Sequence, residues 1–247
     1  MVAAAVAAIT GAAVSASHAA ILVNEPFTYA DGALTSVAPV NTWFAVNTGD
    51  DVQVSNSAVT YGADGKEAYT PFTAQTANTT YYGIDVIVTS LGSLNTTGGY
   101  FATLLQTGTD TTYAAALWTR KDAADATKYN FGVSTRSSST VSWDSVARTV
   151  GTTYRVGASY TIVSGSANDT SSLYIDSTTP IITAAAGTDV SSGGVGRFIF
   201  RQDSTTATPN FTIDNLIVST DVASAIPEPS SLALLGLAGL GLRHRRR

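Results

Sequence analysis

Residues 154–162 of this chain, YRVGASYTI, decide the fold class because their apolar side chains recur at every second position. The even-numbered residues, from Tyr154 to Ile162, share one face of an extended chain, and the odd-numbered ones, such as Arg155 and Ser159, share the other. This alternation predicts a half-buried β-strand, since a helix would repeat its apolar positions every three or four residues.

The same alternation recurs along the rest of the chain, between short connections rich in Thr, Ser, Gly, Asn and Asp. Thr and Ser together account for 63 of the 247 residues, a composition that favours strands and turns over helices. We therefore predict an all-β fold, an antiparallel β-sandwich formed by one domain. The other expected strands are Val52–Tyr61, Ile84–Thr89, Tyr100–Gln106, Tyr113–Thr119, Lys128–Arg136, Thr140–Asp144, Leu173–Ile175, Phe198–Phe200 and Phe211–Ile213.

The composition excludes several kinds of chemistry. The chain has no cysteine, which rules out disulfides, thiol nucleophiles, iron–sulfur clusters and cysteine zinc sites. Its two histidines, His18 and His244, lie near the two ends, so the body lacks the commonest general base. An enzyme built on this body would depend on carboxylates.

The N-terminal segment predicts a secretory signal peptide at residues 1–19. Residues 2–14 form an Ala-rich apolar run, which is shorter than the ~20 residues that span a bilayer. The small residues Ser17 and Ala19 suit cleavage after Ala19. Basic residues usually precede such a run and are missing here, so we expect the true start to lie upstream.

The C-terminal segment combines three features in a fixed order. Pro227-Glu228-Pro229 breaks any preceding strand, an uncharged Leu- and Gly-rich stretch follows, and an arginine cluster closes the sequence. The apolar stretch predicts a short transmembrane helix, lengthened by arginine side chains that reach the membrane surface. Basic residues after such a stretch place this end in the cytoplasm and the body outside. The expected charge anchor consists of Arg243, Arg245, Arg246 and Arg247.

Together these three features resemble a PEP-CTERM protein-sorting signal, and the resemblance covers residues 225–247. It implies a Gram-negative bacterium that makes exopolysaccharide, and export across the inner membrane. It also implies that the tail holds the protein in that membrane until the transpeptidase exosortase processes it, which releases the body to the cell surface or matrix. Pro227, Glu228 and Pro229 would form the recognition element. The chain then divides into a signal peptide at 1–19, a sandwich at 20–224 and a sorting signal at 225–247.

The charge of the body bears on its partners. Without the two ends it has nine Lys and Arg residues against 17 Asp and Glu residues, a net charge of −8. Such a surface repels nucleic acid, and the sequence shows no basic face interleaved with aromatic residues. We therefore expect no nucleic-acid partner.

A second resemblance concerns the body itself. Tyr154–Ile162, Ser172–Asp176 and Ile213–Val218 follow one another in an order similar to that of laminin-G and concanavalin A-like jelly rolls. The opening stretch Glu25–Gly32 resembles the first strand of those domains. The resemblance implies a jelly-roll form of the sandwich, with a generic immunoglobulin-like sandwich as the alternative.

Jelly rolls of this kind include glycoside hydrolases, which need two carboxylates about 5–10 Å apart. The Glu-x-Asp-x-x-Glu spacing of concanavalin-like hydrolases does not occur here, and the body has only Glu25 and Glu67 as glutamates. No Gly-x-Ser-x-Gly motif supports a serine nucleophile. We expect no enzyme and no catalytic residue, with an aspartate-dependent hydrolase or lyase as the alternative.

Aromatic and acidic side chains supply the remaining candidates for binding. Trp43, Trp118 and Trp143 are candidate ligand-binding residues because flat rings stack on sugars, and packing in the core is the alternative. Asp214 is a candidate metal ligand because carboxylate oxygens suit Ca²⁺, although no calcium loop of fixed spacing occurs. We expect no cofactor, with a structural Ca²⁺ ion as the alternative.

These observations predict an exported, non-enzymatic surface or matrix protein whose body binds polysaccharide. Two alternatives stay open. One is a carbohydrate-active enzyme of concanavalin-like fold. The other is a purely structural matrix protein that self-associates through the edges of its Thr-rich strands.

Overall fold

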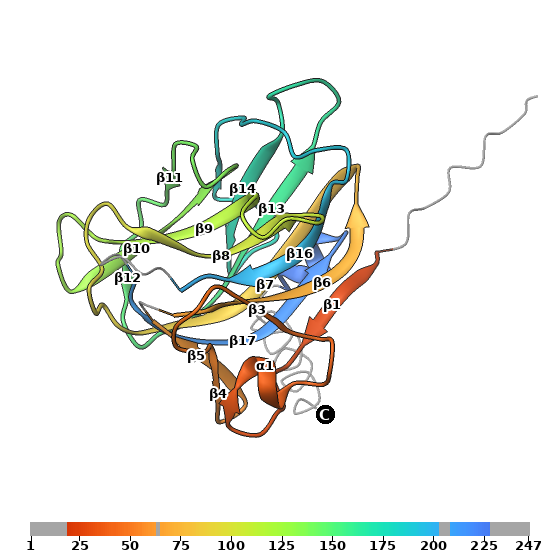
Figure 1. The fold of residues 1–247 in the computed structure, drawn as a ribbon. Coiled ribbons are helices and arrows are strands. Elements are labelled where there is room, and N and C mark those ends of the chain that lie inside the picture. Colours follow the sequence, from red (N-terminus) through yellow and green to blue (C-terminus); the bar gives the residue numbers. More distant parts are fainter. Residues whose placement is uncertain (1–18, 63–64, 203–207, 228–247) are drawn as a thin grey trace, which may run out of the picture.

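The computed structural model describes residues 19–62, 65–202 and 208–227, and shows two antiparallel sheets packed face to face (Figure 1). In these ranges sheet A consists of β1 (Ile21–Glu25), β2 (Gly32–Ala33), β4 (Gln53–Ser55), β5 (Ala58–Tyr61), β7 (Asn78–Ser90), β13 (Thr153–Ile162), β14 (Thr170–Ile175), β15 (Ile182–Thr183) and β17 (Asn210–Ser219). Sheet B consists of β3 (Phe44–Val46), β6 (Glu67–Gln75), β8 (Gly99–Gln106), β9 (Tyr113–Lys121), β10 (Lys128–Ser134), β11 (Ser142–Trp143), β12 (Arg148–Thr149) and β16 (Val195–Phe200). The predicted β-sandwich is confirmed.

The strand order places distant parts of the sequence side by side. Sheet A runs β15-β14-β13-β7-β17-β5-β4-β2, with β1 also paired to β17. Sheet B runs β11-β10-β9-β8-β16-β6-β3, with β12 also paired to β10. Two one-turn helices, α1 (Leu34–Val37) and α2 (Val222–Ala225), follow β2 and β17. The first and last thirds of the chain therefore meet in both sheets.

The two predicted terminal segments fall largely outside this description. Residues 1–18 of the expected signal peptide are not among the described residues, and neither is the tail from Glu228 onward, with Pro229, Arg243, Arg245, Arg246 and Arg247. Pro227 is described and exposed. Within the described ranges, no helix is long and apolar enough to cross a membrane.

Three details differ from the sequence-based expectations. Val52–Tyr61 forms two strands, because Asn56 and Ser57 both take positive φ angles and turn the chain between β4 and β5. The first strand is β1, not Glu25–Gly32, because the chain turns at Phe27, whose φ is 50°. Strand β6, which contains Pro71, was not among the expected strands. Proline is tolerated there because β3 pairs with β6 only as far as Tyr69, which leaves that edge open.

The core lies between the two sheets and is rich in aromatic rings. Phe101 of β8 stacks on Phe211 of β17 with 4.4 Å between ring centroids, and it also contacts Phe131 of β10 at 6.3 Å. Val156 and Tyr160 of β13 are fully buried, which confirms the inward face predicted for that strand. Contacts between rings of opposite sheets hold the two layers together.

Two tyrosine hydroxyls also cross from sheet A to sheet B. The Tyr82 hydroxyl lies 2.7 Å from the carbonyl oxygen of Ala115 and 3.1 Å from that of Ala102, next to irregular pairing between β8 and β9. The Tyr61 hydroxyl donates to the carbonyl oxygen of Phe101 at 2.8 Å. Burial raises the pKa of both tyrosines. The Tyr82 hydroxyl thus lies within hydrogen-bond distance of two carbonyls where the ladder is interrupted. The Tyr61 hydroxyl adds a second hydrogen bond to a carbonyl that also accepts from the Arg201 N–H at 2.8 Å.

Replacing Phe101 tests how far the core depends on rings shared between the sheets. Phe101→Ala should lower the free energy of unfolding by about 3–5 kcal/mol, because it removes a fully buried ring and leaves a cavity. Urea denaturation of the purified protein measures this loss. Val40→Ala is the control, since Val40 is 90% exposed and should change stability little. Equal stability of the two variants would contradict this description of the core.

Candidate functional site

The outer face of sheet B, turned away from sheet A, carries a row of aromatic side chains. Trp143 of β11 and Trp118 of β9 are both cross-strand partners of Gly132 in β10, and Trp118 is the partner of Tyr100 in β8. Ring centroids lie 6.4 Å apart between the two tryptophans and 5.0 Å apart between Trp118 and Tyr100. All three side chains are partly exposed. We call Trp143, Trp118 and Tyr100 the aromatic row.

Two small residues of β10 hold the indoles in place. A β-carbon on Gly132 would lie 2.6 Å from Cε3 of Trp143, so the ring rests directly on the strand backbone. The hydroxyl of Ser134, a fully buried residue, accepts a hydrogen bond from the indole N–H of Trp118 at 2.8 Å. Contacts with β10 therefore fix the positions of both indole rings.

Polar groups continue the aromatic row toward the middle of sheet B. The Tyr113 ring lies 5.3 Å from Tyr100, and its hydroxyl donates to Glu67 at 3.4 Å. Arg201 places its guanidinium 4.1 Å from the centroid of Tyr100 and pairs with Glu67, with 3.2 Å between Nε and Oε1. Burial, followed by the charge of Glu67, raises the pKa of the Tyr113 hydroxyl. Tyr113 is therefore a hydrogen-bond donor at neutral pH.

Two further arginines stack on rings of the same sheet. Arg120 lies 4.5 Å from the centroid of Trp143, and Arg197 lies 4.5 Å from that of Tyr69 while it pairs with Asp110. Such cation–π contacts hold a flexible side chain over a ring face. This face therefore combines partly exposed rings with three guanidinium groups, on a body whose net charge is negative.

The third tryptophan does not belong to this face. Trp43 is only 4% exposed, stacks on Phe200 with 5.5 Å between centroids, and donates its indole N–H to Glu25 at 3.3 Å. The expectation that Trp43 binds a ligand is corrected, because its ring packs inside the core. Glu25 also accepts from the Phe27 N–H at 2.8 Å and from the Tyr29 hydroxyl. This glutamate is thus occupied in fixing the turn after β1.

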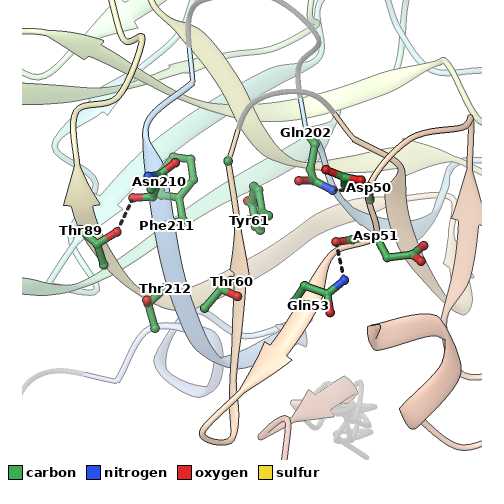
Figure 2. A pocket seen from close by; sticks show the side chains of 11 residues that line it. Asp50, Asp51, Gln53, Thr60, Tyr61, Thr89, Gln202, Asn210, Phe211 and Thr212 are labelled. Atoms are coloured by element: carbon green, nitrogen blue, oxygen red, sulfur yellow. Dashed lines mark hydrogen bonds between the residues drawn. The ribbon is translucent and has the colours of Figure 1, made fainter. Parts of the chain in front are cut away.

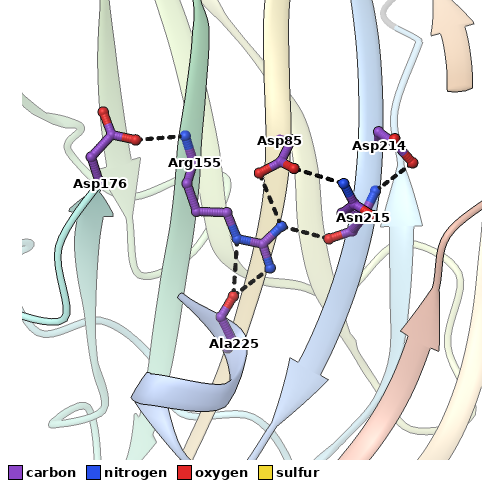
Figure 3. Close-up of polar contacts among 6 residues, drawn as sticks. All are labelled: Asp85, Arg155, Asp176, Asp214, Asn215 and Ala225. Carbon is purple, nitrogen blue, oxygen red and sulfur yellow. Dashed lines mark hydrogen bonds and ion pairs between the residues drawn. The ribbon is translucent and has the colours of Figure 1, made fainter. Parts of the chain in front are cut away.

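Asp214 lies on the outer face of sheet A, in a network with Asn215, Asp85 and Arg155 (Figure 3). The Asn215 N–H donates to Asp214 at 2.7 Å, and the Asn215 side chain donates to Asp85 at 2.8 Å. Burial raises the pKa of Asp214, and the charge of Asp85 adds to this shift. Among the described residues, no three His, Cys, Asp or Glu side chains are grouped to hold a metal ion. The calcium-binding role of Asp214 stays a prediction.

A polar hollow of about 450 Å³ lies where β5, β7 and β17 meet the loop before β4 (Figure 2). Its side chains are mostly engaged with the protein itself. Gln202 donates to the carbonyl oxygens of Asp50 and Lys66 at 2.9 and 2.8 Å, and Lys66 pairs with Asp51 at 2.9 Å. These contacts tie the loop to the end of β16. The polar groups around the hollow therefore mainly hold neighbouring segments of the chain together.

Sequence reasoning singled out two rings of the aromatic row and missed the third ring and the polar groups beside it. Trp118 and Trp143 were candidates, but Tyr100, Tyr113 and Arg201 were not singled out. The strand pattern could place Tyr100 and Trp118 on one face of their own strands. It could not reveal that β8 and β9 are neighbours in register, which is what brings these rings together.

Comparison with known protein families finds one match. The model described as PEP-CTERM protein-sorting motif matches residues 225–247, the segment that the sequence analysis identified. The motif implies export, anchoring in a membrane before processing, and processing by exosortase. A comparison with curated protein sequences finds no match.

Several solved structures are similar to this chain in outline. SCLam, a non-specific endo-β-1,3(4)-glucanase from family GH16, has a TM-score of 0.49 and 10% identity over 83% of this chain and 92% of its own. The CBM2 module of the evolved Dit from Lactobacillus casei BL23 phage J-1 has a TM-score of 0.48 and 11% identity over 81% of this chain and 95% of its own. A Trypanosoma rangeli sialidase has a TM-score of 0.47 and 13% identity over 76% of this chain and 30% of its own. At TM-scores below 0.5, these likenesses carry no conclusion about function.

Replacing Asp214 tests its environment through the pH dependence of stability. A carboxyl whose pKa is raised by folding stabilises the fold while protonated, and this contribution is lost as the pH rises through the raised pKa. Asp214→Asn should therefore increase the free energy of unfolding at pH 7 and change it little at about pH 3.5, where the carboxyl is largely protonated in both states. Urea denaturation at the two pH values measures the difference.

Asp122→Asn is a control for which the expected change in stability at pH 7 has the opposite sign. Backbone N–H groups of Asp125 and Ala124 lower the pKa of Asp122, so its charged form stabilises the fold above the ordinary pKa of aspartate. This variant should lose stability at pH 7 and not at acidic pH. A stability loss in Asp214→Asn at pH 7 would show that the charged form of Asp214 is favoured by the fold.

Proposed function

We propose that this chain is an exported, non-enzymatic protein of the cell surface or extracellular matrix, and that its body binds polysaccharide through the aromatic row. The sorting motif at residues 225–247 supports the export and the surface location. The single observation that carries the binding proposal is the alignment of Trp143, Trp118 and Tyr100 across three adjoining strand pairs, partly exposed on one face.

The shape of the aromatic row suits an extended ligand. Successive ring planes turn by 76° between Trp143 and Trp118 and by 52° between Trp118 and Tyr100, so the rings line a contoured surface. Sugar rings present apolar C–H faces and polar edges, and aromatic rings beside hydrogen-bonding groups match both. The hydroxyl of Tyr113 and the guanidinium of Arg120 provide such groups near the row.

The positions of the two glutamates support a binding role over glycoside hydrolysis. Hydrolysis uses a pair of carboxylates across one bond, about 5–10 Å apart. Glu25 is bonded to Trp43, Phe27 and Tyr29 on the core side of sheet A. Glu67 is bonded to Tyr113 and paired with Arg201 on the outer face of sheet B. The two carboxylates therefore serve separate networks.

Removing rings from the aromatic row should weaken polysaccharide binding. Trp143→Ala and Trp118→Ala should each reduce affinity for the exopolysaccharide of a producing bacterium at least about tenfold, or about 1.4 kcal/mol, because each removes a stacking surface. Tyr81→Ala is the matched control, since Tyr81 lies partly exposed in sheet A beside Tyr174. Isothermal titration of the purified protein, with Ca²⁺ and with a chelator, measures these affinities.

That titration, together with measurements of the oligomeric state and of reducing ends, separates the alternatives. Equal affinities for the three variants and the unsubstituted protein would place binding elsewhere. Absence of binding, together with concentration-dependent self-association, would favour a purely structural matrix protein. Release of new reducing ends from the polysaccharide would favour an enzyme. A loss of binding only with the chelator would point to a calcium-dependent site.

The sorting role has its own test. Replacing Pro227, Glu228 and Pro229 with alanine should leave a chain that keeps its tail and stays in the membrane fraction. The measurement compares the mass and the location of the two proteins in a bacterium that carries an exosortase. Trp143→Ala serves as the control, since it leaves the tail intact and should be processed normally. Normal processing of the triple variant would contradict the sorting role of this motif.

A further inference from the structure

The segment just before Pro227-Glu228-Pro229 is packed onto the outer face of sheet A. After β17, the Asp221 side chain accepts a hydrogen bond from the Ser224 N–H at 2.9 Å and caps α2. Ala225 and Ile226 are fully buried, and they form a small apolar cluster with Tyr174. We call residues Asp221–Ile226 the C-terminal clamp.

Arg155 of β13 binds the end of this clamp (Figure 3). Its Nε and one terminal nitrogen both donate to the carbonyl oxygen of Ala225, the Nε at 3.2 Å. The other terminal nitrogen donates to the carbonyl oxygen of Asn215 at 2.6 Å and pairs with Asp85 at 3.3 Å. Arg155 is only 8% exposed, and a buried cation whose donors lack acceptors would destabilise the fold. The clamp supplies one of its principal acceptors.

Two glycines make room for the clamp on the strands beneath it. A β-carbon on Gly83 of β7 would overlap the carbonyl oxygen of Ala225. A β-carbon on Gly157 of β13 would lie 2.6 Å from Cδ1 of Ile226. This contact explains why the outer side of β13 is buried although the alternation predicted a half-buried strand. The surface of β7 and β13 at these two glycines is therefore complementary to Ala225 and Ile226.

The clamp ends where the recognition element begins. Ile226 is fully buried, and the next residue, Pro227, is exposed. The folded body therefore extends through Ile226, so its last two residues are also the first two residues of the matched sorting motif. A cleaving enzyme needs a segment that has left the fold, because a packed backbone does not fit an active site without local unfolding.

We propose that processing cuts the chain on the C-terminal side of Ile226, and that the clamp stays as the C-terminus of the mature protein. This inference rests on the proposed sorting by exosortase. In the step, one peptide bond breaks, its acyl group passes to an amine or to water, and the released tail keeps the nitrogen with a proton. The body determines where the cut falls because residues up to Ile226 remain packed on β7 and β13.

Mass spectrometry of the protein isolated from a bacterium with an exosortase tests the position of the cut. We expect a mature chain whose last residue is Ile226 or a later one. A last residue before Ile226 in a chain that has lost its tail would overturn the inference while leaving the sorting intact. A chain that keeps its whole tail would instead contradict the sorting role.

A protease experiment on the full chain tests the clamp without exosortase. Thermolysin cuts before apolar residues, so Val222 and Ile226 are sites that the clamp should protect. Ile226→Asp should release the clamp and speed cleavage before Val222 at least about tenfold, because the open state becomes more populated. Ala223→Ser changes an exposed clamp residue and should behave like the unsubstituted protein.

The comparison requires that Ile226→Asp keep its sheets, which circular dichroism measures. Should that variant lose its sheets, Ile226→Ala replaces it, with the same expected direction and a smaller factor. Equal cleavage before Val222 in the folded variant and in the unsubstituted chain would overturn the inference, because the clamp would then give no protection.

Discussion

The structure depends on the burial of one face of each sheet in a shared core. Phe101 and Phe211 meet across the two layers, and the Tyr82 hydroxyl crosses from sheet A to the backbone of sheet B. Because side chains alternate along a strand, this burial commits every second residue to the core and leaves the others on the two outer faces. Those outer faces carry the features that bear on function.

The two outer faces differ in the side chains that they present. Sheet B presents Trp143, Trp118 and Tyr100 beside arginines that stack on rings, which gives a partly exposed surface of apolar faces and hydrogen-bond donors. Sheet A is covered in part by the chain's own clamp, held by Arg155 and by close packing on two glycines. The outer face of sheet B therefore leaves its rings partly exposed, and that of sheet A carries the segment that leads into Pro227.

Much of the fold follows from short-range pattern, and the site follows only in part. The alternation in residues 154–162 and the turn residues between strands were enough to predict a β-sandwich. Strand β6 was not among the expected strands; it contains Pro71, and a proline is compatible with a strand only where one edge is open. Trp43 looked like Trp118 and Trp143 in sequence, yet Phe200 and Glu25 place it in the core. The contact of Arg155 with Ala225 could not be predicted from local pattern, because the two residues lie 70 positions apart in the sequence. The one local sign is Gly157, since a glycine within a strand often marks a close approach of another backbone.

The most direct test of the central claim is tryptophan fluorescence during titration with the exopolysaccharide of a producing bacterium. Trp118 and Trp143 are partly exposed and Trp43 is buried, so acrylamide should quench part of the emission of the free protein. Binding at the aromatic row should shift the emission to shorter wavelength and reduce this quenching in a saturable manner. Saturable binding that leaves both emission and quenching unchanged would contradict a polysaccharide site on the outer face of sheet B.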